Sequence, residues 1–416
     1  MRRKFLFSLF SLAVVSARLA AQPPGAQNAG DIRIEAGQSC PAGTTEIRPR
    51  ICRAPQTPAP SILDYRPVST LVTPAHLVPR AKFAAIDYHG HPQNLVNSAE
   101  GLAQLGAALD SINVRLMVVA DNLSGERLQR ALAAIRSSEK MKDRVRILAG
   151  IDFSSVGPGW ADKAVKQLDA DIAAGAVGVG EIPKFLGLRY RKADGSRLRI
   201  DDPDLDPVWK ECARLGVPVF IHTGDPQEFF RDQIDLTNER WLELSLFPGR
   251  RYPQDQYPSF DELMKERDNL FARNPKTTFI AAHMGWHAND LGRLGKLLDA
   301  HPNVYTEVGA VLYDIGRQPH AAHDFFVKYQ DRIMFGKDSF QPEEYPYYWR
   351  VFETTDEYFD YYRDYHAFWK LYGMGLPDVV LEKLYGLGLP DDVLKKLYYK
   401  NALRLVPGLP KDGWPQ

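Results

Sequence analysis

From residue 84 onward, short apolar runs alternate with longer segments in which apolar residues recur every three or four positions. The eight runs span residues 84–88, 114–120, 145–151, 176–182, 217–221, 278–282, 304–308 and 333–335. Between them the spacing is helical, as at Leu102, Leu105, Leu109 and Ile112. Strands that alternate with helices pair in parallel, and eight such units over about 250 residues predict an α/β fold of the (β/α)8 TIM-barrel type.

An open, doubly wound parallel sheet is the alternative architecture. A Gly-x-Gly-x-x-Gly turn after the first strand would favour it, but the first run continues as His89-Gly-His91-Pro92. Gly178-Val-Gly180 lies inside a later run and is not followed by a phosphate-binding loop. The pattern therefore favours the barrel.

The ends of the chain differ from this repeating body. Residues 1–21 read as an export signal, because Arg2, Arg3 and Lys4 precede an apolar core that is too short to span a bilayer comfortably. We expect a Pro-rich extension over 22–83, the barrel domain with extra C-terminal helices over 84–408, and a tail over 409–416. The mature chain is predicted to be exported, to the periplasm or outside the cell, by a Sec or twin-arginine signal, with an uncleaved anchor as the alternative.

Three cysteines occur in the chain. Cys40 and Cys52 lie in the extension, and in an oxidising compartment we expect them to form a disulfide that adds about 3 kcal/mol of stability. Two free or chain-linking thiols are the alternative. Cys212 lies in a segment with helical spacing and is expected to be a buried, small apolar residue.

Charge excludes some partners. The 52 basic and 52 acidic residues cancel, so the composition indicates neither nucleic-acid binding nor an acidic surface as a partner. No later stretch is apolar enough for a membrane helix, so no stable membrane insertion is expected after signal cleavage. The aromatic-rich residues 345–372 and a duplicated segment, 373–385 and 386–398, are expected either to pack beside the barrel or to form a homodimer contact.

Polar residues stand where the predicted strands end. His89 and His91 are two positions apart on the first run, so both side chains would project from one face of an extended strand. A His-x-His pair also occurs in ordinary loops. His222, His283 and Asp338 follow three later runs, however, and all strand carboxyl ends meet on one face of a barrel.

Imidazoles and a carboxylate on one face are suitable ligands for a borderline divalent ion. We therefore predict one metal ion, with Zn²⁺ as the first candidate and Mn²⁺ or another transition metal as the alternative. Glu181 also ends a run, and a second metal ion stays open.

Four motifs carry a resemblance to a known family. They are Asp-Tyr-His89-Gly-His91, Phe-Ile-His222-Thr-Gly-Asp-Pro, Phe-Ile-Ala-Ala-His283-Met-Gly and Met-Phe-Gly-Lys-Asp338-Ser. Over residues 84 to about 408 the chain resembles the amidohydrolase superfamily, and more narrowly its amidohydrolase-related (family 2) branch. That branch includes metal-dependent hydrolases and decarboxylases that act on aminocarboxymuconate semialdehyde and resorcylate.

The resemblance implies roles for five residues. His89, His91 and His222 would be metal ligands, Asp338 a ligand and proton carrier, and His283 the group that polarises the substrate or moves a proton. The implied function is hydrolysis of a C–O or C–N bond in a small carboxylated or cyclic compound by metal-activated water. Non-oxidative decarboxylation of an aromatic or muconate-type acid is the alternative, and an inactive barrel that serves as a binding protein is a third possibility.

Further candidate residues surround this set. Glu181 would either bind a second metal ion or form hydrogen bonds inside the barrel mouth. Lys184 and Arg189 would bind a substrate carboxylate or pair with acidic side chains, and Lys337 would bind a substrate carboxylate or simply point away. His287, four residues past His283, would line the pocket. The aromatic-rich segment 225–274 would form a lid or pack over the top of the barrel.

Overall fold

The computed structural model describes residues 30–58, 61, 63–235, 237–363, 365, 370–372, 374 and 391–415. The chain divides into two compact units, residues 1–68 and 69–416. The predicted signal segment lies outside the described residues. So does the first copy of the duplicated segment except Met374, together with the first five residues of the second copy.

The first unit holds a small antiparallel sheet in the order β1-β3-β2, with strands Asp31–Arg33 (β1), Thr45–Arg48 (β2) and Ile51–Arg53 (β3). A disulfide joins Cys40 to Cys52, with 5.7 Å between the two Cα atoms, as the sequence predicts. The guanidinium of Arg53 pairs with Asp31 across the sheet at 2.6 Å. So few residues bury little apolar surface, and the covalent bond compensates for the small core.

The second unit is built on a nine-stranded sheet in which all neighbours are parallel, in the order β11-β10-β9-β8-β7-β6-β5-β4-β12. Its strands are Ala85–His91 (β4), Val114–Leu123 (β5), Val145–Ala149 (β6), Val179–Ile182 (β7), Val219–Ile221 (β8), Phe279–Ala281 (β9), Val304–Glu307 (β10), Ile333–Met334 (β11) and Asp338–Ser339 (β12). Each of the eight predicted runs overlaps one of these strands.

The two ends of this sheet belong to one segment of chain. Within residues 333–339, β11 pairs with β10 and β12 pairs with β4. Between these pairings, the backbone N–H of Tyr88 donates to the carbonyl of Phe335 at 3.0 Å. The segment therefore contacts both edges of the sheet, as the eighth strand of a (β/α)8 barrel does, and the predicted fold class is confirmed.

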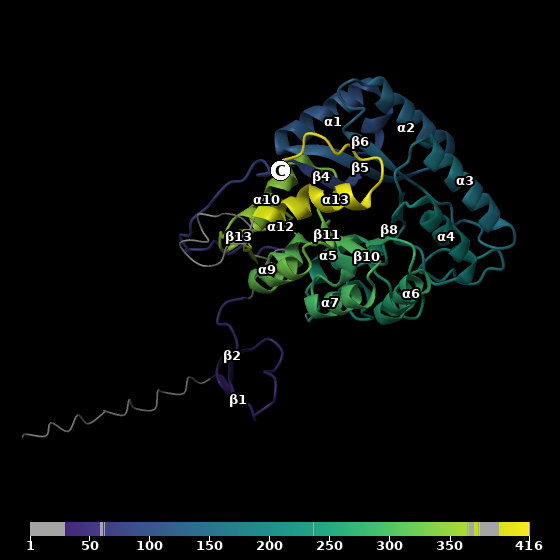
Figure 1. Ribbon diagram of the computed structural model, residues 1–416. Coiled ribbons are helices and arrows are strands. Elements are labelled where there is room, and N and C mark those ends of the chain that lie inside the picture. The colour runs from purple at the N-terminus through teal and green to yellow at the C-terminus, as the bar shows by residue number, and fades with distance from the viewer. Residues whose placement is uncertain are drawn as a thin grey trace, which may run out of the picture. The chain divides into compact units, whose positions relative to one another are not determined.

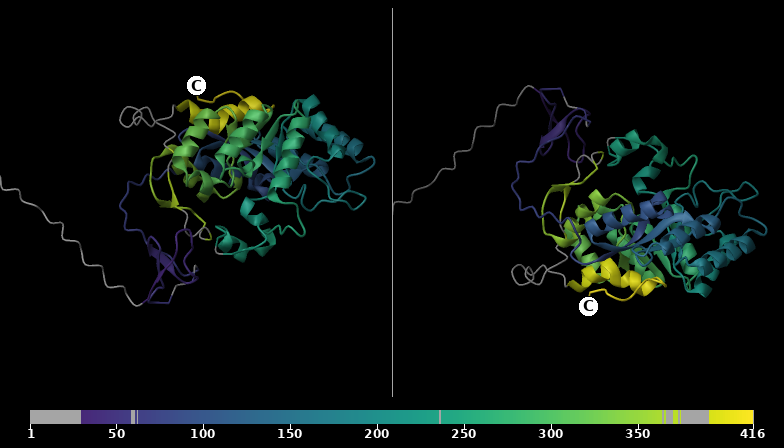
Figure 2. Two further views of the ribbon diagram at one scale, coloured as in Figure 1. Left: turned by 90° about the horizontal axis from the view of Figure 1, so that it is seen from below. Right: turned by 90° about the horizontal axis from the view of Figure 1, so that it is seen from above.

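Helices follow the strands and surround them, as the successive colours in Figure 1 and the two views in Figure 2 show. They are Ala99–Ile112 (α1), Gly125–Ser137 (α2), Trp160–Ala174 (α3), Asp206–Leu215 (α4), Phe260–Arg273 (α6), Leu291–Ala300 (α7) and Pro319–Lys328 (α9). In α1, the predicted residues Leu102, Leu105 and Leu109 are buried, and the Ser98 side chain caps the helix by accepting from Gly101 N.

Shorter elements complete the unit. They are η1 (Gln93–Asn97), η2 (Pro203–Leu205), η3 (Gln227–Phe230), α5 (Trp241–Leu246), η4 (Pro248–Arg250), η5 (Ala282–Trp286), α8 (Leu312–Ile315), η6 (Pro342–Glu344), α10 (Tyr345–Glu353), β13 (Phe359–Asp360), β14 (Lys370–Leu371), α12 (Asp391–Lys395), η7 (Lys396–Lys400) and α13 (Asn401–Leu405). Among the described residues, no helix has both the length and the apolar character needed to cross a membrane.

The predicted aromatic packing is present in both aromatic-rich segments. In the segment 225–274, the rings of Phe230 and Tyr252 stack with centroids 4.8 Å apart. In α10, Trp349 packs on Phe335 of the barrel at 4.6 Å. The closing helix is tied to the last strand, because Asn401 Nδ2 donates to the carbonyl of Ile333 at 2.7 Å.

Candidate metal centre

Residues from five strand ends converge at the carboxyl face of the barrel. His89 and His91 lie on β4, Glu181 lies on β7, and Asp338 lies on β12. The Nε2 atom of His89 is 3.3 Å from Glu181 Oε1 and 3.9 Å from Asp338 Oδ1. The Nε2 atom of His91 is 3.2 Å from Glu181 Oε2 and 3.7 Å from Asp338 Oδ1. Both imidazoles therefore present Nε2 to the same two carboxylates.

His222, which follows β8, and His283, which lies in η5 after β9, complete the group. The Nδ1 atom of His222 is 2.6 Å from Glu181 Oε1, and His283 Nε2 is 3.2 Å from His222 Nδ1. Within the part of the chain that the structure describes, two overlapping sets of atoms within 4.8 Å of one another could hold a metal ion: His89, His91 and Asp338, or His89, Glu181 and His283. The predicted ligand His222 is in neither set. The structure thus brings together all six residues that the sequence proposed as ligands or proton carriers.

Two carboxylates that the sequence analysis did not predict contact the Nδ1 atoms of His89 and His91 on β4. Glu307 Oε1, on β10, is 3.1 Å from His89 Nδ1, and Asp121 Oδ1, on β5, is 2.9 Å from His91 Nδ1. A carboxylate at Nδ1 fixes the orientation and tautomer of a ligating imidazole. A signal for both was present, because Asp121 directly follows the second predicted run and Glu307 is a charged residue inside an apolar run.

The tautomer of His283 follows from its neighbour. Its Nδ1 lies 2.8 Å from the carbonyl oxygen of Gly309, which can only accept, so Nδ1 carries the proton and Nε2 has a lone pair. Burial, together with the positive charges of His222 and His89, lowers the pKa of His283 to about 4. The ring is therefore a neutral base near pH 7, with Nε2 turned toward the other site residues.

The backbone at two of these residues is unusual. His283 has φ 58° and Asp338 has φ 80°, both in the left-handed region that non-glycine residues rarely adopt. Such conformations persist only where the surrounding structure enforces them, and they concentrate at functional sites. Here they aim two side chains of the same site.

The donor set fits a divalent cation. Among the described residues, His89 Nε2, which belongs to both candidate sets, is buried and makes no well-formed hydrogen bond although Glu181 Oε1 lies 3.3 Å away, and such an atom is costly unless another group binds it. Burial opposes the charged form of His89, but the charges of Glu181 and Glu307 outweigh it and hold its pKa well above the usual range. A divalent ion held by imidazole and carboxylate groups would balance the negative charges of these carboxylates.

Two of the predicted substrate-binding cations have acidic partners. Lys184 Nζ lies 2.9 Å from Asp225 Oδ2. Lys337 is buried, and its ammonium contacts the carboxylate of Glu344 and donates to the carbonyl of Ser339 at 2.8 Å. The ion pair of Lys184 is the alternative that the sequence left open for that residue, whereas the pairing of Lys337 with Glu344 was not among the alternatives. A role of either lysine toward a substrate stays a prediction.

Arg189 and His287 also have neighbours within the protein. The guanidinium of Arg189 lies over the ring of Phe185, 4.3 Å from its centroid. His287 is buried, with Nε2 3.2 Å from Arg267 Nη2, and burial and the Arg267 charge lower its pKa to about 2. Substrate binding by either residue stays a prediction.

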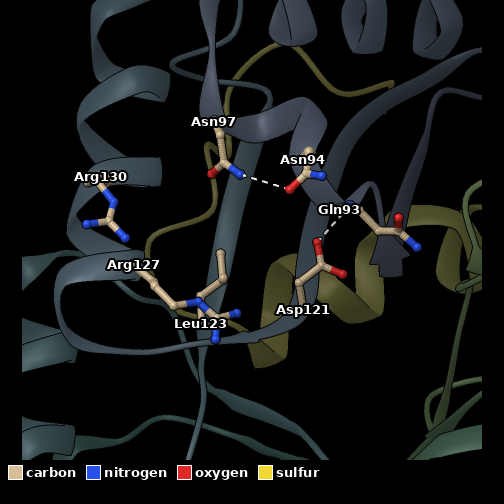
Figure 3. Close-up of a pocket in the computed structure, with 7 residues that line it drawn as sticks. All are labelled: Gln93, Asn94, Asn97, Asp121, Leu123, Arg127 and Arg130. Atoms are coloured by element: carbon tan, nitrogen blue, oxygen red, sulfur yellow. Dashed lines mark hydrogen bonds between the residues drawn. The ribbon is translucent and has the colours of Figure 1, made fainter.

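The site has an enclosed side and an open side. The enclosed side consists of His89, His283 and Glu307, whose side chains are at most 1% exposed. The open side consists of His91, Asp121 and Asp338, and the Asp338 side chain is 32% exposed. Asp121 also borders a cavity of about 630 Å³, where its Oδ2 accepts from Gln93 N at 2.8 Å (Figure 3). The other residues that line this cavity are Asn94, Asn97, Leu123, Arg127 and Arg130.

Fold and site together define a class: a (β/α)8 barrel with a group of histidines and carboxylates suited to metal binding at the carboxyl ends of its strands. The chain belongs to the amidohydrolase family, because the family described as Amidohydrolase matches residues 86–408. No curated protein sequence matches it.

Several solved structures are similar to this chain. An uncharacterised TIM-barrel protein from Bordetella bronchiseptica is 16% identical over 77% of this chain and 97% of its own, with a TM-score of 0.41. 4-Oxalomesaconate hydratase from Rhodopseudomonas palustris is 12% identical over 78% and 95%, with a TM-score of 0.42. 5-Carboxyvanillate decarboxylase from Novosphingobium aromaticivorans, complexed with manganese, is 13% identical over 78% and 96%, with a TM-score of 0.41. At these values the likenesses carry no argument about the reaction.

Proposed function

We propose that the chain is a metal-dependent hydrolase that cleaves a C–O or C–N bond in a small carboxylated or cyclic organic compound. The observation that carries this proposal is the convergence of His89 Nε2 and His91 Nε2 on the carboxylate of Asp338, beside a neutral His283 whose Nε2 lies 3.7 Å from Glu181 Oε1. A divalent cation held by His89, His91 and Asp338 supplies Lewis acidity toward a carbonyl group and lowers the pKa of water toward neutrality.

The protein's own groups divide the proton transfers between them. Asp338 is the most exposed of the convergent carboxylates, so it is placed to take a proton from the attacking water. His283 has its Nδ1–H committed to Gly309 and offers a lone pair at Nε2. It therefore acts first as a proton acceptor, and can serve the leaving group only after it has taken a proton.

Glu181 sets the number of metal ions. Its two oxygens lie 3.3 Å from His89 Nε2 and 3.2 Å from His91 Nε2. Burial raises the pKa of Glu181, but the charges of His89 and His222 outweigh burial and hold the pKa well below the usual range. A permanently ionised Glu181 either balances the charge beside one ion or binds a second one.

Elemental analysis of metal per chain tests the proposal first. We expect about one equivalent of Zn²⁺ or Mn²⁺ in the wild type and its loss in His89→Ala/His91→Ala. Two equivalents would make Glu181 a ligand. No bound metal, and no gain of thermal stability with added Zn²⁺ or Mn²⁺, would contradict the proposal and leave a barrel that only binds its partner.

A substrate screen then separates the reactions. Lactones, amides and aromatic carboxylates are incubated with the metal-loaded protein, with Asp338→Asn as the matched control, and both CO₂ release and the products of water addition, identified by mass spectrometry, are recorded. Products of water addition that Asp338→Asn does not form support hydrolysis. CO₂ release without hydrolysis would assign the chain to the decarboxylases instead.

We also propose that the protein works outside the cytoplasm. The basic and apolar residues at the N-terminus and the Cys40–Cys52 disulfide support this, because such bonds persist in oxidising compartments. Fractionation of cells expressing the full chain, against a chain lacking residues 1–21, tests it. Retention of both forms in the cytoplasm would contradict it.

A further inference from the structure

We propose that Glu307 is a positioning residue that sets two groups at once: the metal ligand His89 and the proton acceptor His283. This inference rests on the metal site of the proposed function. Glu307 is fully buried at the end of β10. Its Oε1 lies 3.1 Å from His89 Nδ1 and accepts the backbone N–H of His283 at 2.6 Å, and its Oε2 accepts the backbone N–H of Gly309 at 2.5 Å.

The contact with His89 determines which nitrogen of that ring is free. An ionised carboxylate can only accept, so His89 Nδ1 keeps its proton and Nε2 is the nitrogen whose proton a metal ion would displace. The Nε2 atom is the one that faces Glu181 and Asp338. Glu307 therefore leaves His89 in the tautomer that can bind a metal ion from the side where the other ligands lie.

The contact with His283 acts through the backbone. His283, Met284 and Gly285 all have left-handed conformations, with φ between 51° and 59°. Glu307 holds this turn at the His283 N–H, and it also holds Gly309, whose carbonyl receives His283 Nδ1–H at 2.8 Å. One carboxylate thus fixes both the chain that bears His283 and the residue that sets its tautomer.

Two glycines confine this carboxylate. A Cβ atom at Gly309 would lie 2.8 Å from Glu307 Oε2 and 2.9 Å from His89 Nδ1, and one at Gly336 would lie 2.6 Å from the same Glu307 oxygen. Real Cβ contacts are not that short, so the two backbones enclose the pair as closely as glycine permits. Glu307 therefore has little freedom to turn away from its three partners.

Glu307→Gln tests the proposal, because a glutamine has one acceptor oxygen for two backbone N–H donors. In the place of Oε1, its amide group would donate to His89 Nδ1 and move the imidazole proton to Nε2; in the place of Oε2, it would face the Gly309 N–H and displace the residue whose carbonyl accepts from His283. We expect Zn²⁺ affinity, measured by competition with a chromophoric chelator on the full chain, to fall about 10- to 100-fold. We also expect the visible absorption of the Co²⁺-substituted protein to change, because loss of a ligand alters its coordination.

Two further variants make the test specific. Glu307→Asp keeps the charge but shortens the side chain, and we expect a smaller loss, roughly 10-fold, with a retained cobalt spectrum. Glu266→Gln removes another fully buried carboxylate that accepts a backbone N–H, from Ile200 at 3.2 Å, and should leave Zn²⁺ affinity unchanged. If Glu307→Gln does not fold by circular dichroism, Glu307→Asp supplies the result.

The outcomes separate the inference from the proposed function. Wild-type Zn²⁺ affinity and an unchanged cobalt spectrum in the folded Glu307 variants would overturn the positioning role alone. A wild-type chain that binds no Zn²⁺ would overturn the proposed function as well. An equal loss of affinity in Glu266→Gln would show only a general effect of removing a buried carboxylate, and would also overturn the inference.

Discussion

His89 and His91 lie two residues apart on the same strand, but the carboxylates that contact their Nδ1 atoms differ in burial. Each turns Nε2 toward Asp338 and Nδ1 toward a carboxylate. On the enclosed side that carboxylate is Glu307, which is fully buried and shared with His283. On the open side it is Asp121, which borders a cavity and is shared with the backbone of Gln93 (Figure 3).

The difference in burial between Glu307 and Asp121 shows how one face of a barrel can be both rigid and accessible. Buried hydrogen bonds are strong in a low dielectric, and a buried polar group without a partner is costly, so the enclosed side has one favourable arrangement. On the open side, solvent can replace a lost partner. We therefore expect changes on the enclosed side to cost more, both in stability and in metal affinity.

The largest expected effect concerns activity. His283→Asn keeps a residue that tolerates the left-handed backbone but removes the base at Nε2, so we expect kcat to fall about 10²- to 10⁴-fold while Zn²⁺ content is retained. Asp338→Asn, on the open side, should lower both kcat and Zn²⁺ affinity, because that carboxylate also binds the ion. The two variants are compared by steady-state kinetics and elemental analysis.

The assignment of the two roles would be wrong if His283→Asn kept wild-type activity, or if it lost its metal ion as fully as the His89→Ala/His91→Ala variant does. The first result would remove His283 from proton transfer. The second would make its Nε2 a metal ligand, as one of the two candidate ligand sets allows.

The next effect concerns packing on the enclosed side. Gly309→Ala places a methyl group 2.8 Å from Glu307 Oε2 and 2.9 Å from His89 Nδ1, and we expect the free energy of unfolding to fall by about 1–3 kcal/mol and Zn²⁺ binding to weaken. Gly249→Ala is the matched control, because nothing lies within 4 Å of a Cβ atom there. Urea denaturation measures both, and a Gly309→Ala variant as stable as Gly249→Ala would contradict the close packing.

Much of the fold could be predicted from the sequence because the barrel strands are continuous apolar runs with polar residues at their ends. Chain order alone then placed His89, His222 and Asp338 on one face, since a parallel barrel collects the carboxyl ends of its strands. The same logic reached His283, although its left-handed backbone could not be read from the run before it.

The partners of these residues could not be predicted in the same way. Glu307 contacts His89, which lies 218 positions away in the sequence. The local sequence around a residue does not show which side chain on a distant strand that residue will contact. Lys184 and Lys337 posed the same difficulty, because the sequence does not show whether a lysine near a site binds substrate, pairs with an acid or points away. Their neighbours Asp225 and Glu344 come from loops whose packing only the folded chain determines.

A third effect concerns acid stability on the enclosed side. The turn that bears His283 rests on Arg267, which donates to the carbonyl of Gly285 at 2.7 Å and lies 3.2 Å from His287 Nε2. Burial and the Arg267 charge lower the His287 pKa to about 2, so below its ordinary pKa of about 6.5 the unfolded chain binds a proton that the folded chain refuses. Stability is then full above about pH 6.5 and is lost as the pH falls toward 2, by about 1.4 kcal/mol per pH unit.

His287→Gln can still accept a hydrogen bond from Arg267 but does not titrate. We expect the pH dependence of its free energy of unfolding between pH 6 and pH 4 to be shallower than that of the wild type by about 1.4 kcal/mol per pH unit. His320→Gln, at an exposed position, is the matched control and should keep the wild-type slope. Equal slopes in all three proteins would mean that His287 is protonated in the folded chain.

The smallest expected effect is on the open side. In Asp121→Asn the side-chain oxygen can still accept from Gln93 N, while its amide group faces His91 Nδ1 and disfavours the metal-binding tautomer. Because the His91 side chain is 21% exposed, solvent can compete with that amide, and we expect a loss of Zn²⁺ affinity of at most about 10-fold, with the free energy of unfolding changed by less than about 0.5 kcal/mol. Chelator competition beside Glu307→Gln measures the contrast. If Asp121→Asn lost as much affinity as Glu307→Gln, burial would not be what distinguishes the two carboxylates, and the shared contact of Glu307 with His283 would be its only special feature.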